Sequence, residues 1–246
     1  MFVTDPWFYL TAIPAILIYG IGKGGLGGAL GIIAVPMMAL VISPIQAAAI
    51  LLPILCVMDL FAIKVHYRSA DYSQLKLMLP GSLVGIAIAG LFLGVIPKAG
   101  LSLLIGSLSL LFCLQYVLNT HKETVPKSAW FWSILGGFSS TTIHAGGGPI
   151  SIYLLPQKLD KVTLIATMAL LFGVINLLKL IPYTVLGHFD RTNLLTALLL
   201  MPLAPIGVKL GVILLHRVSQ NTVYRICYLF LFISGLTLFS DGITGW

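Results

Sequence analysis

Long apolar runs without a charged residue are the feature that most limits what this chain can fold into. Residues 77–97 and 99–120 are two such runs, and each has about the 20 residues that a helix needs to cross the hydrocarbon core of a bilayer. Of the 246 residues, 59% are hydrophobic and only 9% are charged, whereas about 25% are charged in an ordinary soluble domain. The sequence therefore predicts an all-α polytopic integral membrane protein.

The apolar segments occur in the same order twice. Residues 1–119 and 129–246 each contain two short segments separated by a glycine-rich break, followed by three longer segments. A polar connector, 120–128, joins these halves. Repetition of this kind indicates an internal structural repeat. We therefore expect two transmembrane repeats, each with a glycine-broken hairpin and three transmembrane helices, for about 8 to 10 membrane segments in all.

A direct alignment of the two halves supports the repeat. A shift of 117 residues places Asp59 opposite Asn176 and Gly31 opposite Gly148. Identities are sparse, but breaks, spans and connectors agree in order. Because Asp59 is matched by a neutral amide, we expect the halves to differ chemically.

Lysine and arginine residues in the connectors predict the orientation, because cytoplasmic connectors carry the excess of positive charge. Inverted halves place eight basic residues inside and two outside, whereas parallel halves give six and four. The count favours inverted halves, a cytoplasmic connector and external termini. It leaves open whether the hairpins are re-entrant or span fully. The eight are Lys64, Arg68, Lys76, Lys122, Lys127, Lys158, Lys161 and Arg217, and the two are Lys98 and Arg191.

The glycine-rich breaks read GIGKGGLGGALG at 20–31 and STTIHAGGGP at 140–149. Non-helical backbone within a bilayer must be buried by protein or reached by water. Helices that begin after the breaks, near Gly28 and Gly148, would aim their positive N-terminal ends at a shared cavity, where anions bind. The alternative use of glycine is close helix packing, which we prefer for isolated glycines such as Gly85, Gly90 and Gly94.

Polar side chains near the breaks complete the predicted anion site. Lys179 lies three residues after Asn176 on the same helical face, and it either attracts an anion or extends to the interface. His144 either donates to an oxyanion, relays a proton or bonds a backbone carbonyl. We predict substrate contacts for the following residues: Lys23, Gly24, Gly25, Gly27, Gly28, His144, Gly146, Gly147, Gly148, Asn176 and Lys179.

Asp59 is the only acid well inside an apolar span. Ionisable residues at such depth are costly and are functional hypotheses by default. Asp59 is either a proton carrier or a structural partner of a lysine or a helix N-terminus. We favour proton coupling.

Three stretches of the chain resemble the TauE/SafE-like sulfite exporters. They are GGLGGALGIIAVPMMALVISPIQAAA at 24–49, HYRSADYSQLKLMLPGSLVGIAIAG at 66–90, and HAGGGPISIYLLPQKLDKVTLIATMALLFGVINLLKLIPYTVLG at 144–187. The resemblance covers nearly the whole chain, although Lys23 stands where the family often has small residues. It implies a secondary transporter that exports sulfite, an organosulfonate or a related oxyanion across a bacterial inner membrane, driven by an ion gradient, with the proton as the favoured coupling ion.

Other functions have weaker support in the sequence. A passive anion channel would share the breaks and the basic groups. An intramembrane enzyme is disfavoured because GxSxG and HExxH motifs are absent, and we expect no cofactor and no metal. The net charge of +7 is spread over short connectors, which argues against nucleic acid as a partner. The expected partners are a small anion, membrane lipid and protons.

Overall fold

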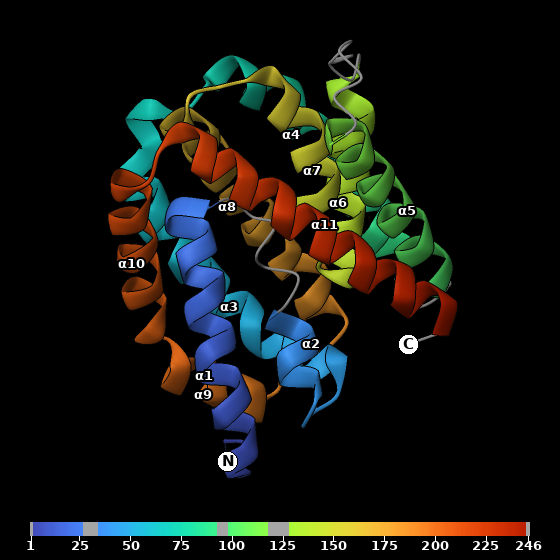
Figure 1. Cartoon of the computed structure of the whole chain (residues 1–246). Helices are drawn as coiled ribbons and strands as arrows, with labels where there is room; N and C mark the ends of the chain where they lie inside the picture. Colours follow the sequence, from blue (N-terminus) through green and yellow to red (C-terminus); the bar gives the residue numbers. More distant parts are fainter. Residues whose placement is uncertain (1, 27–33, 93–97, 118–127, 245–246) are drawn as a thin grey trace.

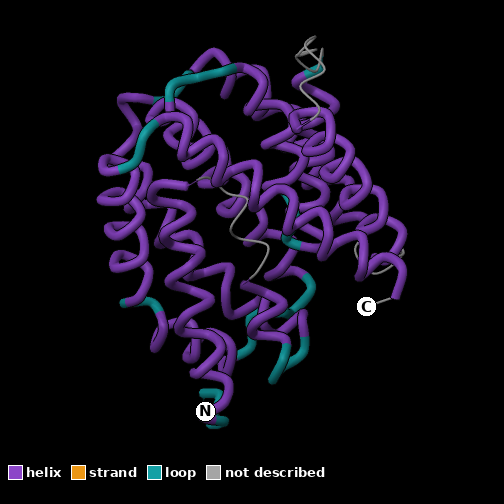
Figure 2. The backbone as a smooth tube through the Cα atoms, viewed as in Figure 1, coloured by secondary structure: helices purple, strands orange, loops and turns teal. Residues whose placement is uncertain are grey.

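Helices account for every regular element in the described part of the chain, which comprises residues 2–26, 34–92, 98–117 and 128–244 of a computed structural model (Figures 1 and 2). The order is α1 (Pro6–Ile21), the π-helix η1 (Gly22–Leu26), α2 (Ala34–Ala39), α3 (Pro44–His66), the 3-10 turn η3 (Tyr67–Ser69), α4 (Tyr72–Phe92), α5 (Lys98–Val117), α6 (Ala129–Ile143), α7 (Gly147–Leu154), the 3-10 turn η4 (Leu155–Gln157), α8 (Lys161–Val185), α9 (Arg191–Leu200), α10 (Leu203–Arg217) and α11 (Gln220–Thr244).

Five of the described helical segments are long and apolar enough to cross a membrane. They are Pro6–Leu26, Ile45–Ser69, Tyr72–Leu91, Lys161–Val185 and Gln220–Thr244. The pair α9 and α10, bent by 44° at its break, makes a sixth if it counts as one span. The all-helical membrane fold is therefore confirmed, while the count of 8 to 10 segments stays a prediction.

The principal helix pairs are reciprocal between the two halves. The helix α1 packs against α10, and α6 packs against α4, so the first helix of each half contacts the same later part of the other half. The helix α3 packs against α8, and α5 packs against α11. A two-fold relation between the halves would produce this pattern. The inverted repeat and the domain boundaries stay predictions, and residues 118–127 of the connector region lie outside the described residues.

Glycine lets several of these helices approach closely enough for backbone contact. A Cβ atom on Gly20 would lie 2.8 Å from the Cα atom of Gly207 in α10, and one on Gly85 would lie 2.1 Å from the carbonyl oxygen of Ile134 in α6. Close approach through small residues is a common way for helices to associate in membranes. The packing role predicted for Gly85 is confirmed. Among the described atoms within 4 Å, a Cβ atom on Gly90 would meet only Pro182, at 3.6 Å, and Gly94 lies outside the described residues.

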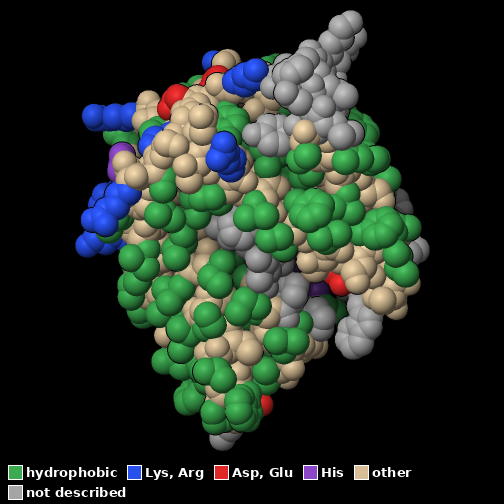
Figure 3. All heavy atoms as spheres, in the orientation of Figure 1, with side chains coloured by type: hydrophobic (Ala, Val, Ile, Leu, Met, Phe, Trp, Pro, Cys, Tyr) green, Lys and Arg blue, Asp and Glu red, His purple; other side chains and the backbone are tan. Residues whose placement is uncertain are grey.

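The long helices α3 and α8 run antiparallel through the centre of the molecule. At one end, the backbone N–H of Asp71, which follows η3, donates to the Thr167 hydroxyl of α8 at 2.9 Å. At the other end, Tyr183 of α8 packs against Ala48 and Leu52 of α3. We call the first the basic end, because exposed lysine and arginine side chains gather there (Figure 3). The chain begins at the opposite end, where Val3 donates to Thr196 of α9.

Replacing Gly85 by alanine is expected to weaken the contact between α4 and α6. The added Cβ atom has no room beside the Ile134 carbonyl, and overpacking of this kind costs about 1–3 kcal/mol. Thermal unfolding of the purified protein in detergent measures the loss as a lower melting temperature. Gly100→Ala in α5 is the control, because a Cβ atom there meets no described atom within 4 Å. Equal melting temperatures for the two variants would contradict the close approach.

Candidate functional site

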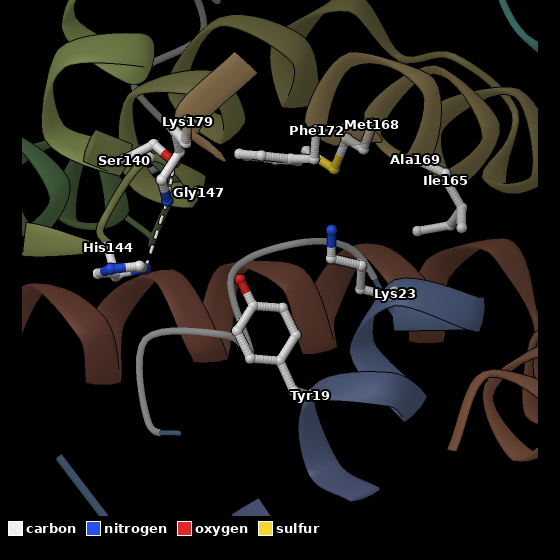
Figure 4. Close-up of a pocket in the computed structure, with 11 residues that line it drawn as sticks. Tyr19, Lys23, Ser140, His144, Gly147, Ile165, Met168, Ala169, Phe172 and Lys179 are labelled. Atoms are coloured by element: carbon white, nitrogen blue, oxygen red, sulfur yellow. Dashed lines mark hydrogen bonds between the residues drawn. The ribbon is translucent and has the colours of Figure 1, made fainter. Parts of the chain in front are cut away.

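A pocket lies between η1, the turn that joins α6 to α7, and α8 (Figure 4). Its empty space is about 440 Å³, including the part that opens to solvent. Lys179, Ser140 and His144 form a polar end, Ile165 lies at the other end, and Lys23 reaches the space between them. The lining residues are Tyr19, Lys23, Ser140, His144, Gly146, Gly147, Ile165, Met168, Ala169, Phe172 and Lys179.

Lys23 reaches the pocket from the π-helix η1, a rare helical form often found at functional sites. The neighbouring glycines face the backbone of α10. A Cβ atom on Gly24 would lie 2.1 Å from the Val208 carbonyl oxygen, and one on Gly25 would lie 1.9 Å from that of Gly211. Only glycine fits this close contact. One side of η1 is thereby held against α10, while Lys23 and the preceding Tyr19 point toward α8 (Figure 4).

The ammonium group of Lys23 is paired with Asp59 of α3, and both residues are almost completely buried. One carboxylate oxygen of Asp59 accepts from Lys23, and the other accepts from the Asn176 amide of α8 at 2.7 Å. The rings of Tyr19 and Phe172 lie 5.8 and 5.7 Å from the Lys23 nitrogen, within the range of cation–π attraction. This cluster joins η1, α3 and α8, and it brings together the two residues related by the shift of 117.

Lys179 is a second buried lysine, only 1% exposed. Its ammonium group donates to the Ser140 hydroxyl and to Nδ1 of His144, both at 3.3 Å. Neither partner carries a negative charge, and no described carboxylate lies within ion-pair distance of Lys179. A buried cation is costly unless an anion compensates it. When Lys179 is protonated, the pocket therefore has an excess of one positive charge, since Lys23 and Asp59 neutralise each other.

His144 lies where α6 ends, in the left-handed backbone conformation with φ 55°. Its Nε2 atom lies 2.5 Å from the Tyr183 hydroxyl of α8. Because an ammonium group only donates, the bond from Lys179 requires Nδ1 to accept. With Lys179 protonated, a neutral His144 ring carries its proton on Nε2 and donates it to Tyr183. This tautomer is inferred from the two contacts rather than observed.

The helix α7 begins at the pocket, with Gly146 as its N-cap. A Cβ atom on Gly146 would lie 2.6 Å from that of Ser140, so a larger residue does not fit. The first N–H groups of a helix have no intrahelical acceptor, and here they add positive potential to the polar end of the pocket. By contrast, the hydroxyls of Ser139, Thr141 and Thr142 donate to carbonyls within α6.

The predicted site residues fall into four groups. Lys23, His144, Gly146, Gly147 and Lys179 line the pocket. Asn176 and Asp59 join it through Lys23. Gly24 and Gly25 contact α10, and Gly148 faces Ser109 of α5. Gly27 and Gly28 lie outside the described residues. Substrate contact stays a prediction for all of them, as does proton coupling for Asp59.

Of the two helix N-termini expected at the cavity, that of α7 borders the pocket. The start expected near Gly28 lies outside the described residues, and the next described helix, α2, begins at Ala34. The described first half therefore contributes the side chains of Tyr19 and Lys23. Equivalent breaks supply different chemistry in the two halves.

Several residues in or beside the pocket were not predicted from the sequence. Tyr19 lies four residues before Lys23, Phe172 four before Asn176, and Tyr183 four after Lys179. Residues spaced by four share a helical face, so this spacing was the available signal. Met168 had no such signal, because apolar residues that line a pocket and those that face lipid look alike in sequence.

The site offers cations and donors but no cluster of metal ligands. Among the described residues, no group of three or more His, Cys, Asp or Glu side chains has the arrangement to hold a metal ion. The chemistry available to the pocket is the binding of an anion by Lys179, Lys23 and the start of α7, together with proton transfer through Asp59 or His144.

Comparison with known proteins identifies the family of the chain. The model of one family, Sulfite exporter TauE/SafE, matches residues 12–238 and confirms the resemblance found in the sequence. No curated protein and no solved structure matches the chain.

Removing one member of the buried pair is expected to cost more than removing both. Lys23→Met leaves the Asp59 carboxylate without its cation, and Asp59→Asn leaves the ammonium without its anion. Each single variant should lose about 3–5 kcal/mol of stability. The double variant should recover most of this loss, because no charge remains uncompensated. Thermal unfolding in detergent measures the cycle. A double variant whose loss equals the sum of the single losses would contradict the pairing.

Proposed function

The chain belongs to the TauE/SafE sulfite exporter family, and from this premise we propose that it exports a small sulfur-containing anion in company with protons. Members of this family are transporters rather than enzymes. The chain is an integral membrane protein, and we place it in the bacterial inner membrane. The candidate substrates are sulfite, an organosulfonate and related oxyanions.

The observation that carries the proposal is the buried ammonium group of Lys179. It faces the pocket, and its bonding partners, Ser140 and His144, are uncharged as bonded. A sulfite or sulfonate oxygen placed there would compensate the charge and accept from the N-terminal N–H groups of α7. Lys23 supplies a second cation within the same pocket.

Asp59 links anion binding to a proton. In the structure, the Asp59 carboxylate is paired with the Lys23 ammonium group. An anion that binds Lys23 competes with this carboxylate, and protonation of Asp59 removes the competitor. Anion and proton are then held together, so they cross in the same direction. The substrate gradient drives export. A divalent anion that moves with one proton also carries one net negative charge, so the membrane potential adds about 2.3 kcal/mol per 100 mV.

The apolar half of the pocket favours an organosulfonate over sulfite. Ile165, Met168, Ala169 and Phe172 line it beyond Lys23. Sulfite has no apolar part to cover these side chains. A sulfonate with a short carbon chain fills both halves, its oxygens at Lys179 and its methylene groups along α8. Each buried CH₂ group adds about 0.8 kcal/mol.

Two inverted halves are the architecture that we propose for the carrier. The reciprocal pairs, α1 with α10 and α6 with α4, support it. So does the hydrogen bond between Asp59 and Asn176, since equivalent residues meet only near a two-fold axis. Alternating access would then follow from rocking of one half against the other around a fixed site.

Uphill movement of labelled sulfite in liposomes tests the function. With the full chain reconstituted, an acidic exterior and an alkaline lumen should drive accumulation inside, because proton and anion move together. Asp59→Asn should abolish this accumulation, since an amide carries no proton. Lys179→Gln should lower the apparent affinity by about tenfold or more, the scale of a charge-assisted hydrogen bond.

The control is Lys209→Gln, which removes an exposed lysine of α10 and should transport as the wild type does. Sulfite flux that ignores the pH gradient would refute coupling and indicate a passive channel. Unchanged affinity in Lys179→Gln would refute the proposed anion site.

Inhibition of sulfite transport by alkylsulfonates tests the substrate preference. Methane-, ethane- and propanesulfonate should inhibit with rising potency, about fourfold per CH₂ group, given about 0.8 kcal/mol for each. Met168→Ala should weaken this trend and leave sulfite transport within about twofold of wild type, because Met168 makes only apolar contacts with the pocket. Equal potency for all three sulfonates would contradict an apolar subsite.

A further inference from the structure

We propose that Tyr183 and His144 form a proton route between Lys179 and the opposite end of the molecule. The inference rests on the proposed function and extends it by assigning Tyr183 as a relay residue.

The route begins with three buried groups in sequence. The Lys179 ammonium group lies 3.3 Å from Nδ1 of His144, and Nε2 of the same ring lies 2.5 Å from the Tyr183 hydroxyl. Tyr183 follows Lys179 by four residues on α8, so both side chains lie on one face of the helix. The imidazole connects them with one nitrogen facing each.

Beyond Tyr183, the route reaches the turn between α8 and α9. The Tyr183 ring contacts the His188 ring edge-on, with centroids 5.5 Å apart. His188 is half-buried, and two hydrogen bonds to its backbone hold the turn in place. Its N–H donates to the Tyr183 carbonyl, and its carbonyl accepts from Asn193 of α9, both at 3.0 Å. This turn lies at the opposite end, far from the basic end that carries Asp71 and Lys161.

Proton transfer along these groups balances at each atom. Lys179 gives a proton to Nδ1 of His144 and becomes a neutral amine. The ring releases its Nε2 proton to the Tyr183 oxygen, which passes its own hydroxyl proton to a ring nitrogen of His188, and His188 then releases a proton to the solvent at that end. His144 ends neutral with its proton on Nδ1. Uptake of a proton by Lys179 from the pocket, followed by return of the ring to its first tautomer, completes the cycle.

The surroundings of the route offer one competing acid. Four elements place titratable groups around Lys179 and Tyr183, and Asp59 is the only carboxylate among those described. Asp59 is engaged by Lys23 and Asn176. The hydrogen-bonded partners of Lys179 are Ser140 and His144, and of these two His144 is the titratable one. The groups are Lys23 of η1, Cys56 and Asp59 of α3, His144 after α6, and His188 after α8.

Tyr183→Phe tests the route, because it removes one hydroxyl and keeps the ring. In liposomes that contain the full chain, exchange of labelled for unlabelled sulfite requires no net proton movement, so it should stay within twofold of wild type. Sulfite accumulation driven by a pH gradient should fall more than tenfold, and so should the proton movement recorded by a lumenal pH dye. Tyr224→Phe, which loses a hydroxyl bond to the Leu159 carbonyl away from the pocket, should behave as wild type in both assays.

A second measurement uses the wild-type protein alone. In D₂O, gradient-driven accumulation should slow at least twofold, while sulfite exchange should not change. Wild-type gradient-driven transport in Tyr183→Phe would overturn the inference. Equal loss of exchange and accumulation would also overturn it, since Tyr183 would then act in substrate binding or folding. Absence of sulfite exchange in the wild type would refute the proposed function, and this inference with it.

Discussion

The buried ion pair between Lys23 and Asp59 is the interaction on which the arrangement of the site depends. Either charge alone would cost several kcal/mol at this depth, so η1 and α3 are held together as long as both remain charged. Asn176 extends the cluster to α8 by satisfying the second carboxylate oxygen. The pair also sets the sign of the pocket, because neutralising Lys23 leaves Lys179 as the excess charge.

Glycine makes this pair possible through packing rather than through ligand contact. Gly24 and Gly25 let η1 lie directly on the backbone of α10. Because this side of η1 is in contact with α10, the Lys23 side chain extends toward α8. The same helix α8 then organises the rest of the site by position along its axis. Its first half, from Ile165 to Phe172, supplies apolar walls, and its second half supplies the amide, the ammonium and the phenol.

Part of this site was predictable from residue type and spacing. Asp59 and Asn176 were matched by the shift of 117, and they are hydrogen-bonded across α3 and α8. Lys179 and His144 were selected for their places near a span end and a break, and they contact each other. The role of the glycines was harder to predict, because a glycine signals close approach without indicating whether a ligand or another helix approaches. Gly24, Gly25 and Gly148 face protein.

The sequence by itself determined the membrane class, the helical content, the place of the breaks and the family, because each depends on local composition or on motifs. Only the tertiary structure decided which cation is neutralised and which is left for an anion. That decision depends on distances between η1, α3, α6 and α8, which lie far apart in the chain. Charge compensation inside a bilayer is a property of neighbours in space, and no spacing along one helix reports it.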